Sequence, residues 1–283
     1  MEWLALLIIG LFGLIIGSFL NVVIVRLPRM LHQAWSAQCN DYMQQKSPQT
    51  EVTKPYNLVF PRSHCPKCNH LIGALENIPV LSFLFLKGKC RHCQAPISCR
   101  YPLIEILTAT LSIVVVYHFG ITWQTVAALL FTWSLLVLTI IDLEEQLLPD
   151  DITLPLLWIG LLINTQGLFT SLESAVFGAI AGYLFLWSVY WLFKLFTGKE
   201  GMGYGDFKLL AMLGAWLGVK ALPVIVLLSS VVGLIVGLSL IALKRLTRGQ
   251  PIPFGPYLAM AGWLSLLWGD KLTHLYSYMI PSL

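Results

Sequence analysis

Two aspartates stand at the boundaries of long apolar stretches. Asp142 ends one stretch in LTIIDLEEQLLPD, and Asp206 begins another directly after Gly203-Tyr204-Gly205. A carboxylate in or at a membrane is costly, so it is a functional hypothesis by default. Two carboxylates about 3 Å apart share a proton, and one can then activate a water while the other acts as an acid toward a carbonyl. The alternative is that each aspartate only caps or anchors its helix. Their shared membrane face and the GxGD context favour the pair.

Four cysteines form two CxxC pairs in a polar segment. Cys65 and Cys68 make the first pair, Cys90 and Cys93 make the second, and 21 residues lie between the pairs. This spacing is typical of a four-thiolate zinc site, which has no open coordination position and is therefore structural. Disulfides or free thiols are the alternative, and a reducing cytoplasm argues against disulfides. The remaining thiols and nearby imidazoles are not interpreted as ligands: Cys39, Cys99, His64, His70 and His92.

Other charged residues near the aspartates have less specific interpretations. The acids between residues 144 and 151 are expected in a solvated loop, where Asp151 can cap the helix that follows. Lys208 either tunes the charge of Asp206 or extends to the membrane interface.

The composition indicates an all-α polytopic membrane protein. Of 283 residues, 57% are apolar and 11% are charged, against about 25% charged in soluble proteins. Residues 3–25 and 221–243 are uncharged runs of 23 residues, and about 20 suffice to cross a bilayer as a helix. About eight spans are expected: 3–25, 102–119, 123–141, 152–168, 174–193, 206–220, 221–243 and 253–270.

The basic residues predict the orientation. Ten Lys and Arg lie between residues 26 and 100, and others cluster at 194–208 and 244–248. The positive-inside rule then places these segments in the cytoplasm and both termini in the periplasm. The span 206–220 has only 11 consecutive uncharged residues, a length also typical of a re-entrant segment. We keep it as a span, because otherwise residues 244–248 would face outward.

Three regions are expected along the chain. Residues 1–25 form the first transmembrane helix, 26–101 a cytoplasmic zinc-ribbon-like domain, and 102–283 a seven-helix membrane domain. Residues 32–57 are polar without a sustained period, which indicates a partly helical or mobile insertion. The glycines of 200–205 follow a membrane span rather than a strand, so they do not predict a soluble methyltransferase loop. No HExxH or Walker motif occurs, and no nucleic-acid partner is expected.

Seven motifs together resemble one family over essentially the whole chain. They are GSFLNVVIVRLP, the two cysteine pairs, ENIP, YPLIEILT, DLEEQLLPD, GMGYGDFKLLAMLGAW and PFGPYLAMAG. The sequence is similar to bifunctional prepilin peptidases and N-methyltransferases, the type IV leader peptidases.

This resemblance implies a multi-pass aspartic peptidase of the cell inner membrane, with an active site that faces the cytoplasm. Its substrates would be type IV prepilins and type II secretion pseudopilins, which it would cleave after Gly. It would then methylate the new N-terminal residue with S-adenosylmethionine. Asp142 and Asp206 would be the catalytic residues, and the four paired cysteines would bind zinc. The resemblance does not identify the S-adenosylmethionine site, for which Glu76 and Glu105 are the candidates.

Two other functions compete with this hypothesis. The first is a peptidase of the same architecture that lacks methyl transfer, and the intact cysteine loop argues against it. The second is a transporter or an assembly scaffold with a zinc ribbon. A transporter would be expected to hold ionisable residues at mid-bilayer, whereas the central thirds of the expected spans contain almost none.

Overall fold

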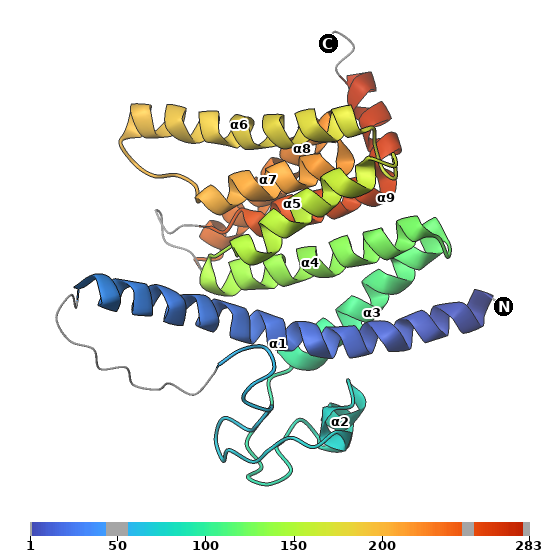
Figure 1. The fold of residues 1–283 in the computed structure, drawn as a ribbon, viewed down its shortest axis with the longest axis vertical. Coiled ribbons are helices and arrows are strands. Elements are labelled where there is room, and N and C mark those ends of the chain that lie inside the picture. Colours follow the sequence, from blue (N-terminus) through green and yellow to red (C-terminus); the bar gives the residue numbers. More distant parts are fainter. Residues whose placement is uncertain (1, 44–55, 245–251, 280–283) are drawn as a thin grey trace. The chain divides into compact units, whose positions relative to one another are not determined.

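The computed structural model describes residues 2–43, 56–244 and 252–279. Within these ranges the regular secondary structure is helical and contains no strand, which confirms the all-α class expected from the sequence. The chain divides into two compact units, Met1–Gly120 and Ile121–Leu283. Each unit is described by itself (Figure 1).

The first unit is built on two helices that pack along each other, α1 (Glu2–Met43) and α3 (Arg100–Phe119). The segment between them holds a short 3₁₀ turn, η1 (Leu75–Asn77), and a short helix, α2 (Leu81–Phe85). A Cβ atom at Gly13 or Gly17 would lie 2.7 Å from the Cα atom of Ala109 or Glu105, respectively. Small residues four apart therefore let the two backbones approach closely, as in many membrane helix pairs.

Helix α1 is longer than the expected span 3–25, because it continues past Pro28 to Met43. Proline usually interrupts a helix, but residues 29–43 contain no glycine and several strong helix formers. The first part of the expected insertion 32–57 is therefore helical. Residues 44–55 of that insertion lie outside the described residues.

The second unit surrounds one short helix, α7 (Tyr204–Leu217), of whose 14 residues ten are buried. It packs against α5 (Asp150–Asn164), α6 (Leu172–Thr197) and α9 (Gly255–Met279). The other helices of the unit are α4 (Trp123–Glu145), η2 (Val219–Ala221) and α8 (Leu222–Ala242). In Figure 1, α7 lies beside α6, and a Cβ atom at Gly182 of α6 would lie 2.6 Å from the carbonyl oxygen of Leu210.

The far end of α7 is fixed by buried polar contacts. Asn164, the last residue of α5, donates to the carbonyls of Ala215 and Trp216 at 2.9 and 3.0 Å. The indole N–H of Trp216 donates to the carbonyl of Leu156 at 2.8 Å. Because buried polar groups are costly unless they are paired, these bonds fix the position of α7 against α5.

Each of the eight expected spans corresponds to a helix. In the described part of the chain, five helical segments are long and apolar enough to cross a membrane: Trp3–Tyr42, Arg100–Phe119, Trp123–Glu145, Leu172–Thr197 and Val219–Ala242. The other three expected spans fall on α5, α7 and α9, which are not among these five segments. The chain is therefore a polytopic helical membrane protein.

Candidate active site and metal centre

Asp142 lies in the last turn of α4, and its side chain is only 5% exposed. Gln146 ends the helix in the left-handed conformation, and its N–H donates to the carbonyl of Asp142 at 3.0 Å. The carboxylate of Asp142 accepts the backbone N–H of Gly255, the first residue of α9. A Cβ atom at Gly255 would lie 2.6 Å from Oδ2 of Asp142. Only glycine therefore fits beside this carboxylate.

Asp206 lies in the first turn of α7 and is 7% exposed. Its carboxylate accepts the backbone N–H of Gly203, the residue that caps the helix. The positive end of the helix dipole also favours negative charge at this position. Gly205 packs on Leu148, whose Cβ would lie 2.8 Å from a Cβ at the glycine.

The structure brings the two aspartates into one site. Their carboxylates are close enough to interact electrostatically. Leu148 contacts glycines from both sides of the site. It packs on Gly205, and its Cδ1 would lie 3.1 Å from a Cβ at Gly255. Oδ2 of Asp142 and Oδ1 of Asp206 are buried and have no hydrogen-bond partner among the described residues. Such atoms are rare in proteins, and a shared proton or a reacting group would give them partners.

Two charged residues near the aspartates, Lys208 and Asp150, form an ion pair. Lys208 donates to both carboxylate oxygens of Asp150, at 2.7 and 2.8 Å. This contact links the start of α5 to α7, a role that the sequence did not predict for Lys208. The cap of α5 is Pro149 rather than Asp151. The aspartates Asp150 and Asp151 lie in its first turn, where the helix dipole favours them.

The four paired cysteines of the first unit form a single cluster. Their sulfur atoms all lie within 4.8 Å of one another, and the Sγ atoms of Cys65 and Cys93 are 3.7 Å apart. Zinc–sulfur bonds of about 2.3 Å in a tetrahedron place neighbouring sulfurs about 3.8 Å apart. All four thiols are free of disulfides. The donor set and its dimensions therefore fit one zinc ion.

The two CxxC pairs fold into the same turn. The first cysteine of each pair donates its N–H to the carbonyl five residues later and accepts the N–H four residues later, at 2.8 to 3.0 Å. Asn69 and Gln94, which follow the second cysteines, both have φ of +56°. The N–H groups of Cys68 and Lys67 point at the Cys65 sulfur and lower the pKa of that thiol to about 6. The turn at Cys65 thus directs backbone donors toward a thiolate, the form that binds metal.

The other thiols stand apart from this cluster. Cys39 lies on α1, Cys99 precedes α3, and both are exposed. Among the described residues, the four paired cysteines are the only metal-ligating group found.

Glu76 lies in a small polar cavity of about 380 Å³ beside the cysteines, lined also by His70, Arg91 and His92. Oε2 of Glu76 accepts the N–H of Gly73 at 3.1 Å and lies 3.7 Å from Nε2 of His70. Oε1 lies 3.6 Å from the Arg91 guanidinium. The Gly73 N–H, followed by the nearby His70 and Arg91 charges, lowers the pKa of Glu76. The cavity therefore combines the Glu76 carboxylate with the Arg91 guanidinium and two imidazoles.

Glu105 is buried in α3 and has a different surrounding. Its Oε2 accepts the N–H of Val80 at 2.7 Å. Val80 has φ of +59°, and the N–H of Leu81 donates to the carbonyl of Pro79 at 2.6 Å. This three-residue turn is a strained γ-turn, and a β-branched residue seldom adopts positive φ. Glu105 therefore holds the segment after ENIP in place and does not line the Glu76 cavity.

Sequence reasoning assigned no role to several residues that build these sites. Leu148 and Gly255 lie inside two of the quoted motifs, DLEEQLLPD and PFGPYLAMAG. Arg26 of α1 is 8% exposed and donates to the carbonyls of Asn57 and Pro61 at 2.9 and 2.6 Å. The available signal was the position of each residue inside a motif, which does not identify its partner.

Comparison with known proteins agrees with the motifs. Residues 11–119 match the bacterial peptidase A24 N-terminal domain, and residues 129–238 match the type IV leader peptidase family. A prepilin leader peptidase/N-methyltransferase of Aeromonas salmonicida is 61% identical over 276 residues, which cover 98% of this chain and 95% of the relative. Proteins of the same name from Pseudomonas aeruginosa and Legionella pneumophila are 57% identical over 266 residues and 46% identical over 277 residues.

These two alignments cover 94% and 97% of this chain, and 91% and 95% of the respective relatives. No solved structure gives a significant match. The similarity therefore extends over nearly the full length of every relative named. The paired cysteines lie within the first matched range, 11–119, and the two aspartates within the second, 129–238. The chain belongs to the type IV leader peptidase family.

Proposed function

We propose that this protein is an inner-membrane aspartic peptidase and N-methyltransferase. It cleaves the leader peptide of type IV prepilins and type II secretion pseudopilins after Gly, and it methylates the new N-terminal residue with S-adenosylmethionine. The names of relatives that are 46% and 61% identical contain both activities. The observation that carries the proposal is the pair of buried carboxylates, each with one oxygen that has no partner among the described residues.

In the proposed peptidase step, Asp142 and Asp206 share one proton. The ionised carboxylate takes a proton from water, whose oxygen bonds to the carbonyl carbon of the peptide, while the protonated one donates to the carbonyl oxygen. Proton transfer to the amide nitrogen then releases the amine as the C–N bond breaks. The backbone N–H groups of Gly255 and Gly203 orient the two carboxylates.

The zinc site is proposed to be structural. Cys65, Cys68, Cys90 and Cys93 would supply four thiolates, which leave no open position for substrate. The metal would link the two CxxC turns, which have the same hydrogen bonds, and so hold the polar segment in a defined shape. Structural zinc supplies folding free energy directly, so residues 26–101 are proposed to form a zinc-dependent cytoplasmic domain, preceded by a membrane helix in 1–25 and followed by a membrane domain in 102–283.

The Glu76 cavity is proposed to receive the methyl donor. S-adenosylmethionine carries an α-carboxylate, an α-ammonium and ribose hydroxyls, and Arg91 and Glu76 offer charges complementary to the first two. The imidazoles of His70 and His92, whose centroids are 4.9 Å apart, offer flat surfaces for the base. Glu105 contacts the segment after ENIP through the N–H of Val80 and does not line the cavity.

The orientation is proposed from charge. Eight spans would place the aspartates and the cysteine domain at the cytoplasmic face and both termini in the periplasm. The short helix α7 would enter the membrane surrounded by protein, because its side chains contact other helices. A substrate that arrives from the cytoplasmic side would then meet the aspartates at the interface.

One experiment tests both activities together. Purified protein is incubated with a prepilin precursor, with and without S-adenosylmethionine, and product masses are measured. We expect the mass of the mature chain without the donor, and an addition of one methyl group with it. An uncleaved precursor would refute the peptidase, and a cleaved but unmethylated product would refute the transferase.

A further inference from the structure

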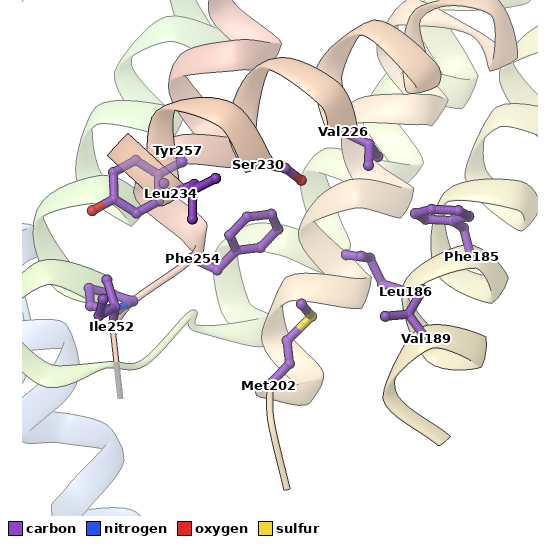
Figure 2. A pocket seen from close by; sticks show the side chains of 12 residues that line it. Phe185, Leu186, Val189, Met202, Val226, Ser230, Leu234, Ile252, Phe254 and Tyr257 are labelled. Atoms are coloured by element: carbon purple, nitrogen blue, oxygen red, sulfur yellow. The ribbon is translucent and has the colours of Figure 1, made fainter. Parts of the chain in front are cut away.

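A second cavity lies within the second unit, between α6, α8 and the start of α9 (Figure 2). Its volume is about 400 Å³, and side chains from these three elements and from the loop before α7 line it. Phe185, Met202 and Phe254 point toward this space, Tyr257 also lines it, and Ser230 adds one hydroxyl. Among the residues that the structure describes, no charged one lines the cavity. The cavity therefore suits an uncharged, apolar group.

Two residues that line this cavity directly precede the glycines that bind the aspartates. Phe254 precedes Gly255, whose N–H donates to the carboxylate of Asp142. Met202 precedes Gly203, whose N–H donates to the carboxylate of Asp206. Consecutive Cα atoms are 3.8 Å apart. A group in the cavity is therefore held by the residues next to both backbone donors of the aspartate pair.

We propose that this cavity is a substrate subsite, which binds an apolar side chain of the precursor close to the bond that is cleaved. The proposal rests on the peptidase function given above. When the scissile carbonyl of a peptide lies at the aspartates, the side chains next to that bond lie within a few ångströms of it. Phe254 and Met202 lie at a similar distance from the site, because each is one residue away from a glycine, Gly255 or Gly203, that binds an aspartate. A lipid acyl chain is the other apolar occupant that a membrane offers, but nothing would require it to lie beside the aspartates.

The two serines of α8 provide a matched test. Ser230 lines the cavity, Ser239 does not, and both are exposed. We expect Ser230→Trp to fill the cavity, whereas Ser239→Trp places the same indole elsewhere on the same helix. Each variant is assayed with two precursor peptides in lipid vesicles, one with apolar residues beside the cleaved bond and one with those residues changed to Ser.

The expected result is a loss of substrate preference in one variant only. Burial of apolar side chains in a pocket discriminates by about 10-fold or more in kcat/KM. The unchanged protein and Ser239→Trp should prefer the apolar peptide by that factor, and Ser230→Trp should cleave both peptides at similar, low efficiency. A preference that survives in Ser230→Trp overturns the subsite. Failure of the unchanged protein to cleave either peptide instead overturns the peptidase function.

A second measurement covers a Ser230→Trp variant that does not fold. A precursor that carries a photo-reactive phenylalanine analogue beside the scissile bond is irradiated with the unchanged protein in vesicles. Adducts should map to Phe185–Val189, Met202 or the first half of α8. Adducts that map only outside the cavity lining would overturn the proposal and leave the cavity to an acyl chain.

Discussion

The contact between Gly255 and Asp142 gives the sharpest structural prediction. A Cβ atom at Gly255 would lie 2.6 Å from Oδ2 of Asp142 and 3.1 Å from Cδ1 of Leu148. Real contacts of a Cβ atom stay above 3.0 Å, so Gly255→Ala must open the first distance by at least 0.4 Å. The carboxylate and the start of α9 must therefore move apart, and the N–H bond from residue 255 weakens.

The magnitude follows from the sensitivity of catalysis to geometry. A misplacement of about 1 Å costs about 10²-fold in rate, so a shift of about half that size should lower kcat by about 10-fold. Alanine is a better helix former than glycine by about 1 kcal/mol. Because Gly255 is the first residue of α9 and the overlap must be relieved, this gain does not set the melting temperature. The assay therefore includes thermal melting, which shows whether a slower variant is still folded.

Gly269→Ala is the matched control, because Gly269 lies on the same helix and a Cβ there would have nothing within 4 Å. Cleavage of a prepilin peptide is followed by mass spectrometry for the unchanged protein and both variants, with thermal melting in the same detergent. We expect Gly269→Ala to match the unchanged protein. If Gly255→Ala also cleaves within about twofold of the unchanged protein, the proposed role of this contact in orienting Asp142 is wrong.

Three further predictions concern the other parts of the molecule. Metal analysis should find one zinc per chain. The Cys65→Ser variant should lose the zinc, and its polar segment should become protease-sensitive, since structural zinc contributes folding free energy. Absence of metal from the unchanged protein, purified without chelators, would contradict this. Glu76→Gln should reduce methylation of a pre-cleaved pilin by about 10-fold, since hydrogen bonds to charged groups contribute about 1.5–3 kcal/mol, and spare leader cleavage; equal losses of both activities would refute the separate donor site. Reporters after residues 60, 147, 200 and 248 should read cytoplasmic, and those near 120, 170 and the C-terminus periplasmic, whereas a cytoplasmic C-terminus would show that one span was miscounted.

Much of the helical fold was predictable because membrane helices have long uninterrupted runs of apolar residues. The expected spans 102–119 and 221–243 agree with α3 and α8 to within two residues at each end. The extension of α1 beyond residue 25 was missed because its continuation is polar and follows Pro28. Apolar runs predict which residues can cross a membrane, but they do not predict where a helix continues beyond the apolar run.

The candidate sites divide in the same way. The cysteine cluster was predictable from spacing alone, because each CxxC turn is local and needs only its own backbone. The pairing of Asp142 with Gly255 was not, since it joins residues that are distant in the chain. Glu105 was named from the sequence as a candidate for the methyl-donor site, and the structure pairs its carboxylate with the N–H of Val80. The identity of that partner depends on a strained turn that no motif encodes.

The most direct test of the aspartic mechanism is cleavage by Asp142→Asn and Asp206→Asn, each measured beside its methylation of a pre-cleaved pilin. Either change removes one member of the acid–base pair, so the account predicts a loss of cleavage by several orders of magnitude. Zinc content, thermal stability and methylation should remain near those of the unchanged protein, which shows that the fold is intact. Near-normal cleavage by either variant would contradict the account.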